Sequence, residues 1–431
     1  MGAQHPQVKA FRGFRYNTKV AGDIAALLAP PYDVIYPDMQ EALYKKNPHN
    51  IVRLILGKTS PADTPADNRY TRSAADLQKF LAAKALVRDE KPAIYVYSQV
   101  YAALGKTYTR TGFIARKKLE DFGGSVKPHE NTFDAPKADR LNLTRACKCN
   151  FSPIFGVYTD KERASDKLLA DIVTGKPDVE AATDDGIVHR LWVVTDAAWI
   201  GKMSAVMEDK GVIIADGHHR YETALNYMKE QAAVGNASDD VKYCLMYFTN
   251  TESEGLVILP THRVINQAAG FDLETFFAKA AAEFDIEKID SADGKRNAAI
   301  EEKLAAKMQA SKKPAFGAYC GGGRYALLVY KVTAFNSPLE KLDVAILHNR
   351  LLNPLVGVKP QTDMDNQVFY NIDIAKCAQR VDDKISLIAF FLNPTPIQHM
   401  RDVSEAGLKM PQKSTYFYPK LISGMVINPL Y

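Results

Sequence analysis

A short apolar run that leads directly into a dense polar motif constrains this chain more than any other stretch. Residues 212–214 (VII) are aliphatic and β-branched, which is typical of a buried strand. Asp216 and Gly217 then interrupt the run, and residues 221–230 have the apolar spacing of a helix. The sequence therefore predicts that residues 218–220 (HHR) lie where a strand becomes a helix.

This junction is suited to binding an anion. The first N–H groups of a helix have no partner inside the helix, and they lie at the positive end of its dipole. His218, His219 and Arg220 add side-chain donors for a phosphate or a carboxylate. The alternative is structural: Asp216 caps the helix, Gly217 permits the turn, and one histidine belongs to the core. The chemistry indicated by the motif is phosphate handling.

The same motif bears on metal binding. Adjacent histidines on a helix diverge by about 100°, so His218 and His219 are not expected to share one ion as an i, i+4 pair can. Asp216 together with one histidine could instead hold a hydrated Mg²⁺. Asp216 is therefore the candidate metal ligand.

Length and composition place the chain among ordinary globular proteins. Its 431 residues suffice for two or three domains, and 46% of them are hydrophobic and 24% charged. The net charge of +5 is a small bias that gives no reason to expect a nucleic-acid partner. We find neither a signal-peptide core nor an apolar run long enough to span a membrane. Five irregularly spaced cysteines do not form a disulfide framework, so we expect reduced thiols in a cytoplasmic protein.

Two further stretches carry polar residues that could join such a site. In the first, a Pro-Pro dipeptide fixes an extended backbone before Asp33, which is either a cap or a carboxylate presented to a ligand. In the second, His129 and Glu130 form an acid/base candidate. Asp139 and Arg140 are predicted to open a helix whose N-terminus would meet an anion. The alternative for the second stretch is a charge-rich loop that is only solvated.

A proline-flanked segment near the end of the chain, residues 410–420, combines two lysines with two hydroxyl side chains. It is either a rigid linker to a last strand or a lid. As a lid, it would bring Lys413, Ser414 and Lys420 to an anionic ligand.

The order of the expected elements indicates the fold class. Strands and helices alternate in the first part of the chain, which predicts an α/β arrangement. Within it, the apolar residues 50–56 (NIVRLIL) are predicted to form a strand. From about residue 264 the pattern changes to longer helices and scattered strands. We therefore predict a mixed α/β (α+β) protein, with an α/β core in residues 1–263 and an additional α+β region in residues 264–431 that would pack back on the core.

Five stretches taken together resemble a family known only as domain-of-unknown-function family 1015. They occur in order, span nearly the whole chain, and are residues 29–35 (APPYDVI), 47–54 (NPHNIVRL), 127–132 (KPHENT) with Asp139 and Arg140, 214–225 (IADGHHRYETAL) and 410–420 (MPQKSTYFYPK). Membership of this family implies little biochemistry.

The DGHHR core, residues 216–220, is also distantly similar to the signature of the ParB/sulfiredoxin-like group, and especially of its ADP- or ATP-dependent free-serine kinases. This resemblance implies a ParB/sulfiredoxin-like nucleotide-binding core in which residues 217–220 hold phosphate. It also implies ATP or ADP and Mg²⁺ as cofactors, with Asp216 shaping the turn or meeting Mg²⁺. The chain departs from the group in its extra C-terminal half and in having no helix-turn-helix with a basic face, which argues against the DNA-partitioning role of ParB.

The main functional hypothesis is a nucleotide-dependent phosphotransferase or phosphohydrolase that acts on a small hydroxylated metabolite. The candidate catalytic residues are Glu130, Asp216 and His218. The candidate phosphate ligands are Gly217, His218, His219, Arg220, Arg140, Lys413, Ser414 and Lys420.

Two other functional classes remain open. One is a ParB-like nucleotide switch that binds a partner or DNA without metabolic catalysis. The other is a metallohydrolase that uses His218, His129 and acidic residues. For the main hypothesis we expect a small-molecule nucleotide and a metabolite as partners, neither nucleic acid nor membrane, and we leave a homodimer open.

Overall fold

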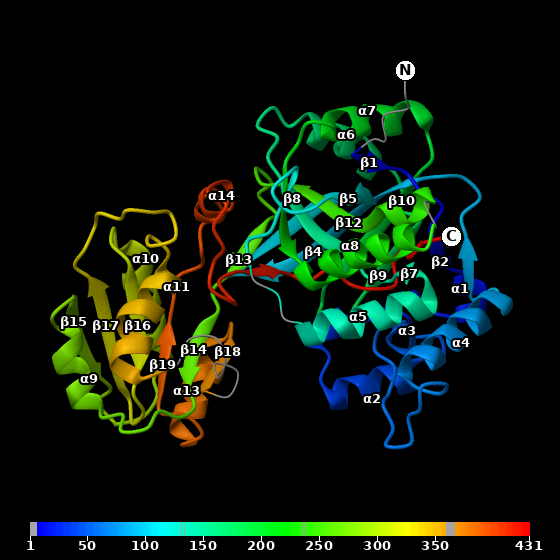
Figure 1. Cartoon of the computed structure of the whole chain (residues 1–431). Helices are drawn as coiled ribbons and strands as arrows, with labels where there is room; N and C mark the ends of the chain where they lie inside the picture. The colour runs from blue at the N-terminus through cyan, green and yellow to red at the C-terminus, as the bar shows by residue number, and fades with distance from the viewer. Residues whose placement is uncertain (1–6, 131, 133, 236–237, 359–366) are drawn as a thin grey trace. The chain divides into compact units, whose positions relative to one another are not determined.

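The computed structural model describes residues 7–130, 132, 134–235, 238–358 and 367–431. Its internal contacts divide the chain into two compact units (Figure 1). Unit 1 comprises Met1–Pro128, Thr132–Val257 and Pro419–Tyr431, and unit 2 comprises His129–Asn131 and Ile258–Tyr418. Both units combine helices and strands, so the mixed α/β class is confirmed. The domain boundary expected between residues 263 and 264 stays a prediction.

Unit 1 is built around a mixed sheet with the strand order β6-β11-β8-β12-β5-β4-β10-β9, and β1 pairs with β5. The pairs β11–β6 and β12–β8 are parallel, and the other described pairs of this sheet are antiparallel. The strands of unit 1 are β1 (Val8–Lys9), β2 (Phe14–Tyr16), β3 (Leu86–Arg88), β4 (Ile94–Ala103), β5 (Lys106–Lys118), β6 (Val126–Lys127), β7 (Cys149–Asn150), β8 (Ile154–Tyr158), β9 (Val179–Ala182), β10 (Val188–Val194), β11 (Val212–Asp216), β12 (Tyr243–Asn250) and β21 (Asn428–Pro429).

The helices of unit 1 cover this sheet and build the N-terminal part of the unit (Figure 1). They are α1 (Thr18–Ala21), η1 (Ile24–Ala26), η2 (Tyr32–Val34), α2 (Pro37–Lys46), α3 (Val52–Ile55), α4 (Arg69–Ala82), α5 (Asp134–Cys147), α6 (Ala164–Val173), α7 (Ala197–Met207), α8 (His218–Ala233) and η3 (Asp239–Lys242).

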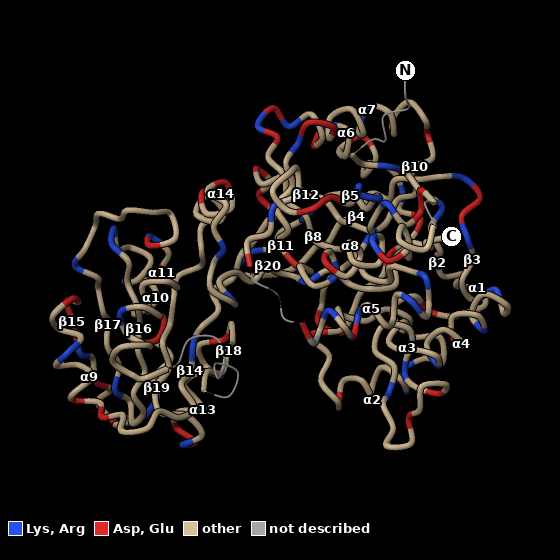
Figure 2. The backbone as a smooth tube through the Cα atoms, viewed as in Figure 1, with Lys and Arg blue, Asp and Glu red and all other residues tan. Residues whose placement is uncertain are grey.

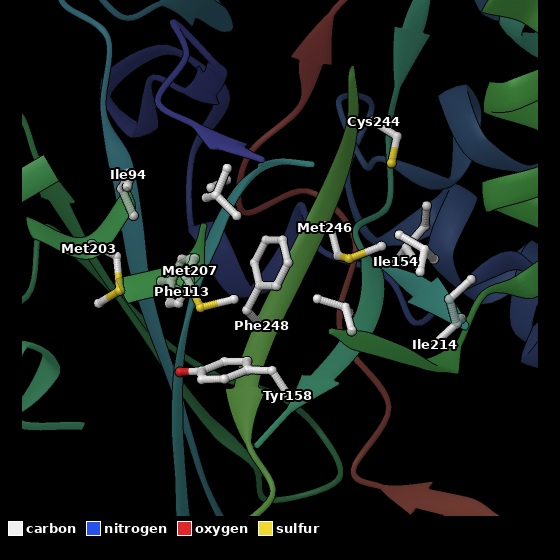
Figure 3. Packing of buried hydrophobic residues seen from close by; sticks show 14 of the residues in the cluster. Ile94, Phe113, Ile154, Tyr158, Met203, Met207, Ile214, Cys244, Met246 and Phe248 are labelled. Carbon is white, nitrogen blue, oxygen red and sulfur yellow. The ribbon is translucent and has the colours of Figure 1, made fainter. Parts of the chain in front are cut away.

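The main core of unit 1 lies on one face of this sheet, where alternate strand residues meet α6, α7 and α8. Phe113 of β5 and Phe248 of β12 are register partners, and their rings stack with centroids 5.0 Å apart (Figure 3). Both are fully buried, and each such side chain contributes about 1.5–3 kcal/mol through burial. This packing fixes the strands of the sheet, including β11, which ends at the candidate site residue Asp216.

Helix α8 is held by the apolar face that the sequence predicts. Tyr221, Ala224 and Leu225 lie one helical turn apart or less, and all three are buried in the same core. The hydroxyl of Tyr221 also donates to the backbone carbonyl of Glu120 at 2.8 Å. Helix α5 packs against α8, and the two run side by side (Figure 1).

The last segment of the chain, Pro419–Tyr431, is part of unit 1. Residues 421–430 are buried. The backbone of Ile427 exchanges two hydrogen bonds with Phe14, both 2.9 Å long, and the Ile427 side chain joins a second core formed with α2 to α5. This anchoring places the residue that precedes the buried segment, Lys420, inside unit 1.

The prediction of a strand for residues 50–56 is wrong, because Val52–Ile55 forms α3. The Asn50 side chain explains the difference. Its amide nitrogen donates to the carbonyls of Ala26 and Leu28, and its oxygen accepts the N–H of Val52 at 2.8 Å. These bonds begin a helical turn in a short apolar run whose periodicity alone does not distinguish a strand from a helix.

Unit 2 contains an antiparallel sheet with the strand order β15-β17-β16-β19-β14-β18. Its strands are β14 (His262–Ile265), β15 (Phe284–Asp290), β16 (Ala315–Tyr319), β17 (Arg324–Tyr330), β18 (Val368–Asn371), β19 (Ile388–Phe391) and β20 (Tyr416–Tyr418), and β13 (Val257–Leu259) starts at the boundary between the units. Its helices are α9 (Leu273–Ala280), α10 (Ala298–Ala310), α11 (Asp343–Ile346), the π-helix η4 (Leu347–Val356), α13 (Ile374–Asp382) and α14 (Ile397–Glu405). The glycine triplet at 321–323 forms the hairpin turn between β16 and β17.

Both faces of the unit 2 sheet are covered by helices. Ile265 and Phe390 belong to a core shared with α9 and η4, whereas their strand neighbours Val264 and Phe391 belong to a core shared with α10 and α13. Neighbouring residues on a strand point to opposite faces, so this partition shows a sheet that is buried on both sides.

The described part of the chain contains no disulfide, and all five cysteines are free and buried. None of the described helices is both long enough and apolar enough to cross a membrane. Lysines and arginines are interspersed with acidic residues through both units (Figure 2).

Unit 2 contains two buried histidines, His262 and His348, and we therefore predict that low pH destabilises it. Burial, and next the positive charge of Arg263, lowers the pKa of His262 and of His348 to about 3. Because each stays neutral in the folded protein while the unfolded chain takes up a proton below about pH 6.5, stability is complete above that pH and falls as the pH decreases toward 3. Each histidine should lower the free energy of unfolding by about 2 kcal/mol when the pH falls from 7.5 to 5.

His348 offers the cleaner test because its Nε2 has no hydrogen-bond partner among the described residues, whereas His262 Nδ1 accepts the N–H of Leu392. We expect the free energy of unfolding of His348→Leu to fall by about 2 kcal/mol less than that of wild type over this pH interval. The measurement is urea unfolding followed by circular dichroism. An unchanged pH dependence would contradict the assignment of a neutral His348.

Candidate functional site

The predicted strand-to-helix junction is confirmed. Strand β11 ends at Asp216, Gly217 adopts the left-handed conformation with φ 92° and ψ 30°, and α8 begins at His218. A Cβ atom on Gly217 would lie 2.8 Å from the Cζ and Nη2 atoms of Arg220. Position 217 therefore favours glycine for two reasons. Glycine adopts the left-handed backbone conformation, and it leaves the space that the guanidinium of Arg220 occupies.

The carboxylate of Asp216 binds two cations. Its Oδ2 accepts a hydrogen bond from Arg220 Nη2 at 2.6 Å, and its Oδ1 accepts one from Lys420 Nζ. Arg220 Nη1 donates in addition to the carbonyl of Pro153 at 2.5 Å. The three charged side chains are only 11–17% exposed. Because two cations share one carboxylate, this cluster of Asp216, Arg220 and Lys420 retains one net positive charge.

The electrostatics of Asp216 follow from this arrangement. Burial disfavours its charged form, but the charges of Lys420 and Arg220 outweigh that cost and hold the pKa of Asp216 well below its usual range. His218 also lowers the pKa of Asp216, so its ring lies within electrostatic range of the carboxylate. Asp216 is therefore an anion throughout the physiological pH range, and it orients both cations.

The first turn of α8 adds to the positive potential. His218 is buried and His219 is half-buried, and the turn contains no acidic residue. A helix N-terminus without an acidic residue in its first turn favours anions, because free N–H groups and the positive end of the dipole lie together there.

Asp139 and Arg140 do not open a helix, so this prediction is wrong. Helix α5 already begins at Asp134, because Pro136 is tolerated in a first turn, where its missing N–H is not needed. Asp139 accepts hydrogen bonds from Arg69, from the Tyr70 hydroxyl at 2.8 Å, and from Arg140 Nε at 2.7 Å. This second cluster also has two cations for one carboxylate.

Arg140 is fixed by more than its acidic neighbour. Its Nη1 donates to the carbonyl of Ile55 at 2.6 Å, and its guanidinium lies over the ring of Tyr32, 3.9 Å from the centroid. Tyr32 occupies the rigid loop in which the sequence singled out only Asp33. The side chain of Asp33 itself is exposed.

A cavity of about 50 Å³ lies within unit 1. Arg140 of α5 and Arg220 of α8 both line it, together with Tyr32, Thr144 and Thr223. The two arginines that the sequence placed in separate motifs therefore meet at one cavity.

The remaining candidates belong to unit 2. His129 is buried, and its Nε2 lies 2.9 Å from the hydroxyl of Thr415. Glu130 accepts the backbone N–H of Lys413 at 2.6 Å, and the Ser414 hydroxyl donates to the carbonyl of Pro411. These bonds stabilise the turn that carries Lys413, whose side chain is exposed.

The sequence analysis missed one acidic residue next to the motif. Glu222 lies on α8 four positions after His218, and its carboxylate accepts the Thr132 hydroxyl at 2.9 Å and lies 3.1 Å from Lys137 Nζ. The i, i+4 spacing from His218 was an available signal, because residues so spaced lie on one helix face.

Metal binding does not fit Asp216 in this arrangement, because each carboxylate oxygen already accepts a bond from a cationic group. Within the described ranges, no group of three or more His, Cys, Asp or Glu residues is arranged to hold a metal ion. The Asp216 carboxylate therefore orients Arg220 and Lys420 and is not assigned to Mg²⁺.

Comparison with known proteins gives one family and several structures, and no curated protein matches. Free serine kinase in complex with AMP is 12% identical, with a TM-score of 0.32 and coverage of 68% of this chain and 83% of that chain. C-terminally truncated SbnI from Staphylococcus aureus is 10% identical, with a TM-score of 0.34 and coverage of 74% and 87%. A conserved hypothetical protein from Pyrococcus furiosus is 13% identical, with a TM-score of 0.32 and coverage of 69% and 89%.

These TM-scores are too low to establish a shared fold, so the family is decided by sequence. Residues 8–345 match the model of DUF1015, a family described as proteins of unknown function. This confirms the family that the five motif stretches indicated. The chain belongs to the DUF1015 family.

Proposed function

We propose that the turn at residues 216–220, together with Lys420, binds the phosphate groups of a nucleotide, and that the protein is a nucleotide-dependent phosphotransferase or phosphohydrolase acting on a small hydroxylated metabolite. The observation that carries the proposal is the cluster of Asp216, Arg220 and Lys420 at the N-terminus of α8. It places two oriented cations and one net positive charge where the helix dipole also favours an anion.

Arg220 has the donors that such a role needs. A guanidinium carries five N–H groups, and Arg220 uses two nitrogens in its bonds to Asp216 and Pro153. Its geometry is fixed before a ligand arrives, so a phosphate meets preorganised donors instead of a flexible side chain. A nucleotide is the phosphate ligand that the resemblance of the DGHHR core to the free-serine kinases implies.

In the proposed transfer, a hydroxyl oxygen of the metabolite attacks the terminal phosphorus of the nucleotide. The bond from that phosphorus to its bridging oxygen breaks, the hydroxyl proton passes to a carboxylate, and the nucleotide leaves with one phosphate fewer. In the phosphohydrolase reaction, water takes the place of the metabolite. The two cations would stabilise the charge that develops on the phosphoryl oxygens.

Two glutamates are candidates for the carboxylate that orients the hydroxyl. Glu130 is the choice made from sequence, and it belongs to unit 2. Glu222 belongs to unit 1 and lies one helical turn beyond His218, held by Thr132 and Lys137. Both remain candidates in the proposal, and kinetics separates them.

The first prediction concerns the cation that the chain end supplies. We expect Lys420→Ala to weaken ADP and ATP binding at least tenfold in calorimetric titration, because one of the two phosphate-facing cations is lost. Lys229→Ala is the matched control, since Lys229 lies on the same unit and pairs with Asp121 on the surface. Lys420→Arg should restore part of the affinity.

The melting temperature of every variant is also measured without ligand. A loss of nucleotide affinity can then be distinguished from a loss of folded protein. Equal nucleotide affinity of Lys420→Ala and the Lys229→Ala control would contradict the phosphate site. Because Asp216 is not assigned to Mg²⁺, ADP should raise the melting temperature in EDTA as well.

A second prediction concerns Gly217. An alanine there costs about 1–3 kcal/mol in backbone strain, and its Cβ displaces the Arg220 guanidinium. Gly235 also has a positive φ, 80°, but nothing lies within 4 Å of its added Cβ. We expect both alanine variants to lose stability in urea unfolding, whereas only Gly217→Ala loses nucleotide affinity. Equal affinity of the two variants would show that Arg220 does not bind the ligand.

A third prediction identifies the acid/base residue. Replacing the correct glutamate by glutamine should lower kcat about 10²–10⁴-fold with little change in nucleotide affinity. Glu130→Gln and Glu222→Gln are therefore compared in the same assay of phosphate release or transfer. Unchanged kcat in both variants would exclude both residues. Nucleotide binding without any turnover would instead favour the alternative of a nucleotide switch.

A further inference from the structure

The cavity in unit 1 differs chemically from a phosphate site. Of the described residues that line it, two are arginines and none is acidic. Much of the remaining lining is apolar, including Ile55, Leu143, Phe151 and Ile154. The cavity therefore combines cationic groups with an apolar surface, which suits a ligand that is charged at one end only.

Each arginine at this cavity shares its carboxylate with a second cation. Asp139 serves both Arg69 and Arg140, and Asp216 serves both Arg220 and Lys420. Each carboxylate thus leaves one positive charge in its cluster. Arg140 is 7% exposed, and the Arg220 side chain is 11% exposed. A buried guanidinium that shares its carboxylate with another cation can still gain from a charge-assisted hydrogen bond to a second anion.

Tyr32 supplies a neutral donor at the same place. Its hydroxyl forms no hydrogen bond within the described ranges of the chain, although it lines the cavity. Burial, and next the neighbouring Asp33, raises the pKa of Tyr32 to about 12 against the opposing charges of Arg140 and Arg220. The hydroxyl therefore keeps its proton at neutral pH, and both arginine charges lie within its electrostatic range.

Size limits what can enter. A volume of about 50 Å³ corresponds to roughly four water molecules at ~10–15 Å³ each. That is room for a carboxylate and one to three carbons, and it is too small for a nucleoside or a hexose. The nucleotide of the proposed function therefore does not occupy this cavity.

We propose that the cavity binds the carboxylate of a short organic acid that carries no amino group, and that this acid is the hydroxylated metabolite of the proposed function. The inference rests on that function for the role of the acid, but not for its binding. A phosphate exposes oxygens on every side and would leave some against the apolar lining without donors. An ammonium group would find no acidic residue to pair with.

The test uses wild-type protein without nucleotide and measures binding of glycolate and lactate by calorimetric titration. We expect both acids to bind, whereas glycine and ethylammonium bind at least tenfold more weakly. Tyr32→Phe keeps the ring that lies over Arg140 and removes only the hydroxyl, so glycolate affinity should fall about tenfold. Tyr36→Phe is the control, because Tyr36 is 72% exposed and does not line the cavity.

Three outcomes overturn the inference: no binding of either acid, binding of glycine as tight as that of glycolate, or equal affinities in Tyr32→Phe and Tyr36→Phe. The parent proposal fails separately, if the Lys420→Ala and Gly217→Ala variants keep nucleotide affinity. Acid binding that depends on Tyr32 in a protein that binds no nucleotide would support the cavity assignment and refute its role as acceptor site.

Discussion

The Asp216 carboxylate, shared by Arg220 and Lys420, is the interaction on which the rest of the site depends. An isolated acid at this depth would be protonated, and two isolated cations would repel each other. Together they form a cluster in which the acid stays ionised and each cation has a fixed direction. Replacing Asp216 would remove the carboxylate that both buried cations share, so the orientation of Arg220 and Lys420 depends on this one residue.

The same arrangement occurs twice in unit 1. Asp139 pairs with Arg69 and Arg140 as Asp216 pairs with Arg220 and Lys420. In both clusters the carboxylate orients the cations without neutralising them, and one arginine from each reaches the cavity. The packing of α5 against α8 brings these arginines together. The proposed anion site therefore depends on the helix pair and not on one motif alone.

Gly217 shows how the backbone serves this electrostatic arrangement. A left-handed residue at the end of β11 lets α8 start at once, and the missing side chain leaves room for Arg220 to fold back onto Asp216. The hydrophobic core holds the strand, the helix and the buried C-terminal segment in place. The free energy that orders the charged groups comes from this packing, since the desolvation cost of a buried ion pair offsets much of its attraction.

Sequence reasoning succeeded where the signal was local. The β-branched run, the glycine and the apolar spacing after it predicted the strand, turn and helix, because these patterns depend on neighbours within one or two turns. It failed where a side chain interferes with the periodicity, as Asn50 does in α3 and Pro136 does at the start of α5. It also passed over Tyr32 and Glu222. Glu222 follows the histidine-rich motif directly, but its i, i+4 spacing from His218 was not used.

By itself, the sequence determined the family, the mixed α/β class and the position of the strand-to-helix turn at residues 216–220. Only the tertiary structure decided that Lys420, 204 residues away, binds Asp216, and that Arg140 and Arg220 line one cavity. The reason is physical: the pairing of distant side chains depends on the anchoring of the chain end against Phe14 and on the contact between α5 and α8. Neither is encoded in the spacing of residues along one segment.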